Sequence, residues 1–309
     1  MTVKQYDIKL ENGNRNFSTL SSLPHDQVFN GRVWTRVIFL IHGFPDNNTS
    51  FNGIWNLMLD AFPGETVLLL APLIRGYEPS SQGSFSQYRP SDFAGDIKEF
   101  ITSIKPDGRP VHLLGHDWGA ITTFKTAQLY PQLVTSIATL SIPYIANMKI
   151  WELLWYAPEQ AYLSSYFLTM GLWGYTEKFK QTGKDSYLDY LWKYWSPTWN
   201  YPREAIENVR NTLTNNNVID HAASYYSCLI NPLNIRQIKW IVDFNKVPAI
   251  IMGGETDGCM SVRILRREKV KLAGQNVSVK EIPNAGHFLQ REEPEIVAKL
   301  ASDWFLQHS

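Results

Sequence analysis

Cysteine and long apolar runs are both scarce in this chain of 309 residues. The two cysteines, Cys228 and Cys259, have the spacing of neither a disulfide framework nor a metal site, so we expect free thiols in a reducing compartment. No stretch approaches the roughly 18 consecutive apolar residues that a transmembrane helix needs. Residues 1–10 are polar and charged, unlike a signal peptide. These features predict a cytoplasmic protein without membrane insertion.

An excess of charge is also missing. Lys and Arg together number 29, and Asp and Glu also number 29, so the formal net charge is zero. Proteins that bind a phosphate backbone or an anionic membrane usually carry a basic excess. We therefore expect neither nucleic acid nor a charged membrane surface as a partner. The length fits one large α/β domain with an insertion.

The chain does contain a regular alternation of short apolar runs and helix-like segments. The apolar runs have the length and composition of buried strands and lie at 37–41, 66–70, 110–114, 136–142, 247–252 and 277–282. The helix-like stretches lie at 51–61, 90–104, 120–130 and 294–306. Continuous apolar strands separated by helices indicate a mostly parallel, doubly wound α/β sheet that is covered on both faces.

Residues 144–237 interrupt this alternation. They lack strand-like runs and hold six of the 11 tryptophans and 11 of the 15 tyrosines. A helical insertion over the carboxyl edge of the sheet, where open α/β sheets bind ligands, is the interpretation that we favour. Any single aromatic residue could equally serve only to pack the insertion onto the core. The predicted organisation is a core of residues 1–143 and 238–309 with a helical cap at 144–237.

A sharp turn after the third apolar run presents Asp117. Residues 115–119 read Gly-His-Asp-Trp-Gly, and a helix-like stretch follows at once. Flanking glycines are typical of a nucleophile elbow, where the backbone approaches so closely that side chains would clash. Such turns usually present Ser, and Asp117 could instead be a helix N-cap. As a nucleophile, a carboxylate with a pKa of about 3.9 is ionised at neutral pH and attacks an sp³ carbon without a base.

The ester formed by such an attack must be hydrolysed, and two residues late in the chain suit that step. His287 lies in a loop after the last apolar run, and Asp257 follows the run before it. The order nucleophile, acid, histidine is that of α/β-hydrolase triads. His287 would activate water while Asp257 orients its ring, with Glu255 as the alternative acid.

A second loop could stabilise the oxyanion of that hydrolysis. Residues 42–45 read His-Gly-Phe-Pro and follow the first apolar run. The backbone N–H groups of Phe44 and Trp118 can converge on one oxygen, which would make them the oxyanion hole. We expect His42, Pro45 and Trp118 to line the substrate site.

Taken together, these motifs resemble the epoxide hydrolase branch of the α/β-hydrolase fold. The resemblance covers nearly the whole chain and rests on five segments: 42–45, 71–77, 115–119, the loop at Asp257, and 284–288. It implies an α/β-hydrolase fold and an enzyme that converts small apolar epoxides and water to vicinal diols. It implies no metal and no organic cofactor. It also implies a cis peptide bond between Phe44 and Pro45.

Members of that family use two cap tyrosines to protonate the departing epoxide oxygen. Tyr226 resembles the second of them, and Tyr162 is nearest to the first, with Tyr156 or Tyr166 as alternatives. A phenol with a pKa of about 10 keeps the proton that it must donate.

Two other functions remain open on the same residues. The related haloalkane dehalogenases share the Asp elbow followed by Trp, but they commonly carry Asn where this chain has Phe44. A ligand-binding protein is the other alternative, because a fold does not dictate function. A diol from an epoxide, halide from a bromoalkane, or binding alone would separate the three. Arg75 and Tyr77 are expected to be structural.

Overall fold

The computed structural model describes residues 4–146, 148–167, 170, 175–183, 185–231 and 239–309. Its centre is a sheet of eight strands in the order β1-β2-β4-β3-β5-β6-β7-β8. The strands are β1 (Tyr6–Asn12), β2 (Arg15–Ser21), β3 (Arg36–Ile41), β4 (Val67–Pro72), β5 (Val111–His116), β6 (Ser136–Leu140), β7 (Ala249–Gly254) and β8 (Val277–Ile282). β1 and β2 form an antiparallel hairpin that joins β4 antiparallel, and β3 to β8 run parallel. The predicted fold class and all six predicted strands are confirmed.

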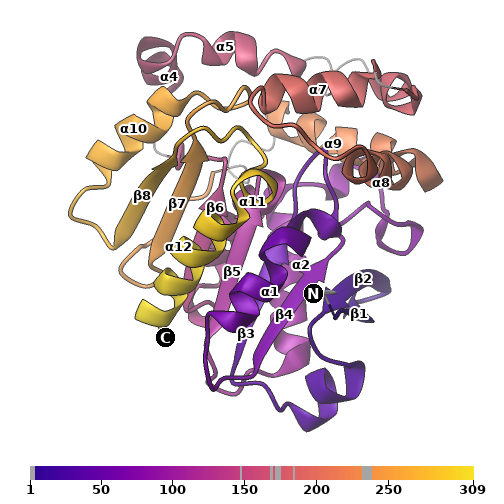
Figure 1. Ribbon diagram of the computed structural model, residues 1–309, viewed down its shortest axis with the longest axis vertical. Coiled ribbons are helices and arrows are strands. Elements are labelled where there is room, and N and C mark those ends of the chain that lie inside the picture. Colours follow the sequence, from indigo (N-terminus) through magenta and orange to yellow (C-terminus); the bar gives the residue numbers. More distant parts are fainter. Residues whose placement is uncertain (1–3, 147, 168–169, 171–174, 184, 232–238) are drawn as a thin grey trace.

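Helices cover both faces of this sheet (Figure 1). The core helices are α1 (Asn52–Asp60), α2 (Pro90–Ile104), α3 (Trp118–Leu129), α10 (Val262–Lys271), α11 (Leu289–Glu292) and α12 (Pro294–Gln307). α1, α11 and α12 pack with Ile38 and Leu40 of β3 on one face, and α2, α3 and α10 pack with Val37 and Phe39 on the other. Successive strand residues point to opposite faces, so burial of both faces explains the continuous apolar run in β3.

α2 shows why a core helix forms where it does. Pro90 occupies its first turn, where a missing N–H costs nothing and the fixed φ suits a helix. Phe93, Ile97 and Ile104 recur at helical spacing and are buried against the sheet. Burial of each such side chain contributes about 1.5–3 kcal/mol. The helix ends at Lys105, whose φ of 48° is left-handed.

We refer to residues 144–237 as the cap segment. Its helices are α4 (Ile150–Tyr156), α5 (Gln160–Leu163), α7 (Tyr187–Trp195), α8 (Arg203–Thr214) and α9 (Val218–Ile230), and its described residues contain no strand. These helices lie above the carboxyl ends of the parallel strands (Figure 1). The indole N–H of Trp192 on α7 donates to the carbonyl oxygen of Pro45 at 3.1 Å, which joins the cap segment to the loop after β3.

Short helical turns complete the described chain. The 3-10 turns lie at Asn48–Phe51, Pro79–Ser81, Phe85–Gln87, Pro131–Leu133, Tyr175–Lys180 and Asn215–Asn217, and a π-helical turn lies at Gln27–Gly31. Among the residues that the structure describes, no helix has both the length and the apolar character needed to cross a membrane.

Candidate active site

Asp117 stands at the turn between β5 and α3, as predicted, with φ 51° and ψ −115°. A Cβ atom on Gly119 would lie 1.9 Å from the carbonyl oxygen of Ile41, and one on Gly115 would lie 2.2 Å from that of Gly119. Glycine is therefore required at both positions. The positive φ at a non-glycine residue is backbone strain of the kind that collects at functional sites.

Three predicted residues come together at the carboxyl edge of the sheet. Nδ1 of His287 lies 3.0 and 3.2 Å from the two carboxylate oxygens of Asp257, and Nε2 lies 3.7 Å from Oδ2 of Asp117. Glu255, the alternative acid, is exposed and instead accepts a hydrogen bond from the backbone N–H of Asn284 at 3.1 Å. The geometry therefore favours Asp257 as the partner of His287.

The two carboxylates set the charge of His287. Burial disfavours the imidazolium, but the negative charge of Asp257, its hydrogen bond to the ring and the negative charge of Asp117 outweigh this effect and raise the pKa of His287 to about 10. The resting site is therefore an imidazolium between two carboxylates. Among the described residues, Nε2 of His287 has no hydrogen-bond partner, so the nitrogen that faces Asp117 is open to a reacting group.

The loop after β3 brings a backbone donor to Asp117. The N–H of Phe44 donates to Oδ1 of Asp117 at 2.8 Å. A Cβ atom on Gly43 would lie 2.5 Å from the side chain of Asp117, so this approach also needs glycine. Trp118 is the first residue of α3, where backbone N–H groups have no acceptor within the helix. The Phe44–Pro45 peptide bond is cis, which confirms the prediction.

His42 and Pro45 support this loop. The ring of His42 is buried, with Nδ1 3.0 Å from the carbonyl oxygen of Gly43 and Nε2 accepting from the N–H of Ile74 at 3.1 Å. Burial lowers the pKa of His42 to about 4, so the ring is neutral. Both ring nitrogens are engaged by backbone, which corrects the prediction that His42 binds substrate. The carbonyl of Pro45 faces the cap segment.

Tyr226 on α9 closes the site from the cap segment. Its ring packs on Phe44, Trp118 and Tyr166 at centroid distances of 5.6, 5.5 and 5.5 Å. The hydroxyl is buried and has no hydrogen-bond partner among the described residues. Burial and the charge of Asp117 raise the pKa of Tyr226 well above its usual value, so the phenol stays protonated.

The prediction that Tyr162 is the partner of Tyr226 is wrong. Tyr162 is 68% exposed on the outer surface of α5, because its position on the helix turns the side chain away from the core. Tyr156 is also exposed. Tyr166, weighed as an alternative, packs on Tyr226, and burial raises the pKa of its phenol well above the usual value. Spacing along the chain could not reveal which of these tyrosines faces inward.

Trp195 at the end of α7 is a site residue that sequence reasoning missed. Its ring packs on His287 at a centroid distance of 4.9 Å, and its carbonyl oxygen accepts the N–H groups of Gly258 and His287, each at 3.1 Å. A Cβ atom on Gly258 would lie 2.0 Å from the carbonyl oxygen of Tyr194, and one on Gly286 would also clash with this end of α7. The glycines beside Asp257 and His287 were the signal that another backbone comes close.

One group of side chains in the described chain has the composition of a metal site. Asp257, Cys259 and His287 each offer a ligand atom within 4.8 Å of the others. Asp257 and His287 are already paired with each other, and Asp257 also accepts the backbone N–H of Cys259 at 2.7 Å. Burial raises the pKa of the Cys259 thiol well above its usual value, so the sulfur keeps its proton. The contacts within this group are thus those of the pair formed by Asp257 and His287.

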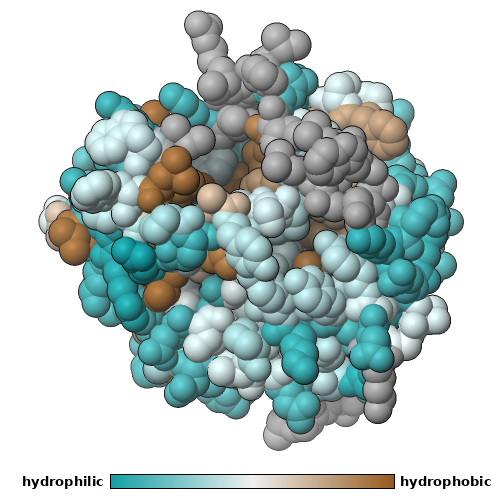
Figure 2. Space-filling view, turned by 90° about the horizontal axis from the view of Figure 1, so that it is seen from above, coloured by the Kyte–Doolittle hydropathy of each residue, from teal (hydrophilic) through white to brown (hydrophobic). Residues whose placement is uncertain are grey.

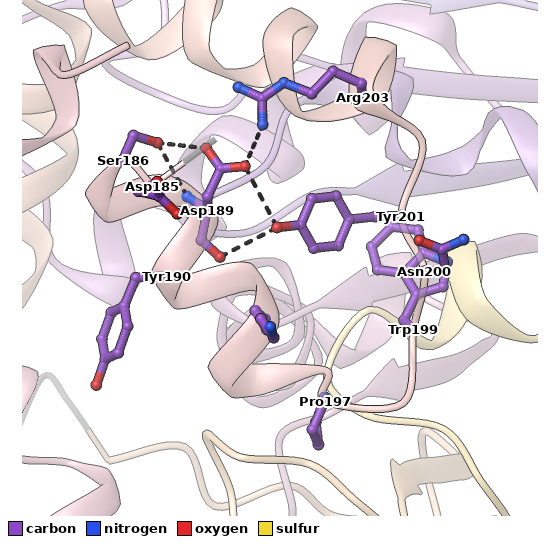
Figure 3. A pocket seen from close by; sticks show the side chains of 10 residues that line it. Asp185, Ser186, Asp189, Tyr190, Pro197, Trp199, Asn200, Tyr201 and Arg203 are labelled. Carbon is purple, nitrogen blue, oxygen red and sulfur yellow. Dashed lines mark hydrogen bonds and ion pairs between the residues drawn. The ribbon is translucent and has the colours of Figure 1, made fainter. Parts of the chain in front are cut away.

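The cap segment also carries a surface pocket of about 650 Å³ that is separate from Asp117 (Figure 3). The carboxylate of Asp189 lies at its base and binds Ser186, Arg203 and Arg210. The carboxylate of Asp189 is thus satisfied by its neighbours. Asp117, Asp257 and His287 do not line this pocket, so it is separate from the candidate active site.

A second pocket, of about 250 Å³, lies between α5 and α7 on the side of the cap segment that faces the candidate active site. Tyr166 and Trp195 line it, and the same two rings pack on Tyr226 and His287. The upper face of the molecule, where the cap segment lies, mixes hydrophilic and hydrophobic side chains (Figure 2).

The fold and this constellation define an α/β hydrolase: the chain belongs to the α/β hydrolase fold family, whose model matches residues 36–294. Epoxide hydrolase 2 of Caenorhabditis elegans is 24% identical over 297 residues, which cover 93% of this chain and 79% of that protein. Epoxide hydrolase 4 of Homo sapiens is 24% identical over 292 residues, which cover 91% of this chain and 75% of that protein. Among solved structures, a laboratory-evolved variant of potato epoxide hydrolase has a TM-score of 0.75 at 19% identity and covers 98% of this chain and 100% of that one. These structural likenesses establish the fold.

Proposed function

We propose that this protein is an epoxide hydrolase in which Asp117 is the nucleophile and His287 the base. The observation that carries the proposal is a pair of protonated phenols, those of the half-buried Tyr166 and the buried Tyr226. They pack against each other, and Tyr226 also packs on Phe44 and Trp118, which flank Asp117. A carboxylate alone could displace many leaving groups. Proton donors above it suit a leaving oxygen that stays attached to the substrate, as in an epoxide. The names of the similar proteins support the same activity.

In the first step, a carboxylate oxygen of Asp117 attacks one epoxide carbon and the bond from that carbon to the epoxide oxygen breaks. The oxygen takes a proton from a cap tyrosine and becomes a hydroxyl group. The product is a neutral ester on Asp117. Because ring opening releases no fragment, the enzyme then carries the entire mass of the substrate.

Loss of the Asp117 charge prepares the second step. The pKa of His287 is about 10 partly because Asp117 is an anion. Once Asp117 is an ester, that contribution disappears and the pKa falls, so the imidazolium can return a proton to the tyrosinate through water. His287 is then neutral and can act as a base.

In the second step, His287 takes a proton from water while the water oxygen attacks the ester carbonyl. The N–H groups of Phe44 and Trp118 would stabilise the resulting oxyanion, a contribution that is typically about 3 kcal/mol for one donor. Collapse of the intermediate expels the diol oxygen, which takes the remaining hydroxyl proton. Asp117 returns as a carboxylate and His287 as an imidazolium, the state in which the cycle began.

His287→Gln tests the mechanism because it should permit the first step and stall the second. Intact-mass measurement after incubation with styrene oxide should show a gain equal to the whole substrate, mapped to Asp117. A bromoalkane should give no adduct, whereas a haloalkane dehalogenase would gain only the alkyl group. Asp117→Ala in the same background should abolish the adduct. No adduct from a broad panel of epoxides would contradict the proposal and favour a ligand-binding role.

A further inference from the structure

Cys259 contacts the cap tyrosine and the loop of the acid at the same time. Its sulfur lies 3.3 Å from the hydroxyl oxygen of Tyr166. Its backbone N–H donates to Asp257 at 2.7 Å, and its carbonyl oxygen accepts from the side-chain amide of Gln160 at 2.9 Å. The side chain is 2% exposed. The backbone of Cys259 is therefore held from two sides, and its buried thiol lies against the phenol.

Hydrogen-bond counting limits what this contact can be. A phenol and a thiol each have one proton, and only one of the two protons can lie between the oxygen and the sulfur. If Tyr166 donates to Cys259, its proton is turned away from the substrate. If Cys259 donates to Tyr166, the phenol proton is free for the epoxide oxygen.

We propose that Cys259 is a positioning residue that donates its S–H proton to Tyr166 and so directs the phenol proton into the site. The inference rests on the proposed function, in which Tyr166 and Tyr226 protonate the epoxide oxygen. As Tyr166 gives up its proton, negative charge develops on its oxygen. A donor to that oxygen then gains strength in the transition state, which lowers the barrier to ring opening.

The surrounding charges keep the thiol protonated, which this direction of donation requires. Among the described residues, the titratable groups near Tyr166 and Cys259 include Asp117, Asp257, His287, Tyr194 and Tyr226. The two carboxylates disfavour a thiolate, so the sulfur retains the proton that it must donate. A neutral thiol also avoids adding a third negative charge next to His287.

Infrared spectroscopy tests the direction of the bond without catalysis. An S–H group that donates a hydrogen bond absorbs at lower frequency than a free one. In the intact protein, Tyr166→Phe should therefore shift the Cys259 band to higher frequency, with Cys259→Ala used to assign the band. Cys228→Ala is the control that assigns the S–H band of the second thiol, which lies 3.4 Å from the carbonyl oxygen of Phe85. An unchanged S–H band in Tyr166→Phe would overturn the proposal.

Single-turnover kinetics with styrene oxide test the consequence for ring opening. Cys259→Ala should slow formation of the Asp117 adduct by about 5- to 10-fold, the usual worth of one such hydrogen bond, while ester hydrolysis keeps its rate. Cys259→Ser should restore the rate to within about twofold, since a hydroxyl also donates. Measured against Cys228→Ala, these changes separate a lost donor from a lost buried side chain.

A double-mutant cycle completes the test. In a Tyr166→Phe background, Cys259→Ala should have no further effect on ring opening, whereas in a Tyr226→Phe background its full effect should remain. An equal effect in both backgrounds, or a slowed ester hydrolysis, would show that Cys259 acts through Asp257 or through packing and would overturn the proposal. Adduct formation by His287→Gln reports separately on the proposed function, so its failure is distinguishable from failure of the role of Cys259.

Discussion

Single residues at this site work through the charge and hydrogen bonds of their neighbours. Asp117 accepts from Phe44, faces His287 at 3.7 Å and lies below the phenol of Tyr226. Each of these contacts changes when Asp117 becomes an ester. The chemistry of the site therefore depends on the charge state of one carboxylate, which makes it accessible to single substitutions.

Tyr226→Phe removes only a hydroxyl group that has no hydrogen-bond partner among the described residues. The fold should be unaffected, because the ring and its packing on Phe44 and Trp118 remain. Ring opening should slow by about 10²-fold, the low end of what a positioned acid contributes. Rapid-quench measurement of adduct formation checks this, with circular dichroism as the control for folding. Unchanged kinetics would remove Tyr226 from the role of proton donor.

Asp117→Asn should change how stability depends on pH. The pKa of His287 is raised from 6.5 to about 10 in the folded protein, so its ion pairing stabilises the fold fully below pH 6.5 and is lost as the pH rises to 10. Removing the Asp117 charge lowers the pKa of His287 in the folded protein. The pH range over which the ion pairing of His287 stabilises the fold then becomes narrower. The difference in free energy of unfolding between wild type and Asp117→Asn should therefore shrink between pH 7 and 10, measured by urea denaturation. Parallel curves across that range would contradict the coupling.

At the scale of elements, α7 fixes the positions of the loops after β7 and β8, which carry Asp257 and His287. The carbonyl oxygen of Trp195, its last residue, accepts from the N–H groups of Gly258 and His287, and the hydroxyl of Ser196, just after the helix, accepts from that of His287 at 2.9 Å. The loops after β7 and β8 thus keep their spacing because a helix from the cap segment is bonded to both. The cap segment contributes to the geometry of the triad as well as to the enclosure of the site.

Gly258→Ala should disturb this arrangement, because its Cβ atom would lie 2.0 Å from the carbonyl oxygen of Tyr194. We expect a loss of about 1–3 kcal/mol of stability, as for other overpacked sites, and slower ester hydrolysis because Asp257 moves with the loop. Gly95→Ala on α2 is the matched control, since no atom lies within 4 Å of its added Cβ. Thermal unfolding and single-turnover kinetics measure both effects. Equal stability of the two variants would show that α7 can shift without loss of stability, which would contradict the prediction.

At the scale of the whole molecule, the reacting groups are enclosed and substrate must pass the cap segment. The side chain of His287 is fully buried and Asp117 is 3% exposed. The pocket between α5 and α7 ends at Tyr166 and Trp195, one ring away from Tyr226 and His287. The lining is aromatic on the inner side, which suits a small apolar epoxide.

Ser165→Trp at the rim of this pocket should therefore restrict entry. We expect kcat/KM to fall several-fold for styrene oxide and less for the smaller methyloxirane, because a bulkier side chain at the rim narrows the opening and hinders the larger substrate more. Ser103→Trp, on the exposed side of α2, is the control for adding a surface indole. Steady-state kinetics with both epoxides decide the matter. Equal losses for the two substrates, or none, would direct the search for the route of entry elsewhere.

The sequence alone predicted the six parallel strands, four of the six core helices, and the convergence of Asp117, Asp257 and His287; it did not predict the hairpin of β1 and β2, or α10 and α11. The convergence could be predicted because the carboxyl ends of parallel strands meet at one edge of a sheet, so that residues after β5, β7 and β8 must converge. The glycines beside Asp117 carried the same information, since only a close approach of backbone requires them. Local pattern and the topology of a parallel sheet were sufficient for these features.

Only the tertiary structure decided which cap residues face the site. Tyr162 and Tyr166 are one helical turn apart in the chain, yet the first is 68% exposed and the second packs on Tyr226. The inward direction depends on how the short α5 sits on the core, which no periodicity in a segment rich in aromatics specifies. The contact of Tyr166 with Cys259 and the packing of Trp195 on His287 arise in the same way, because each joins residues that are far apart in the chain.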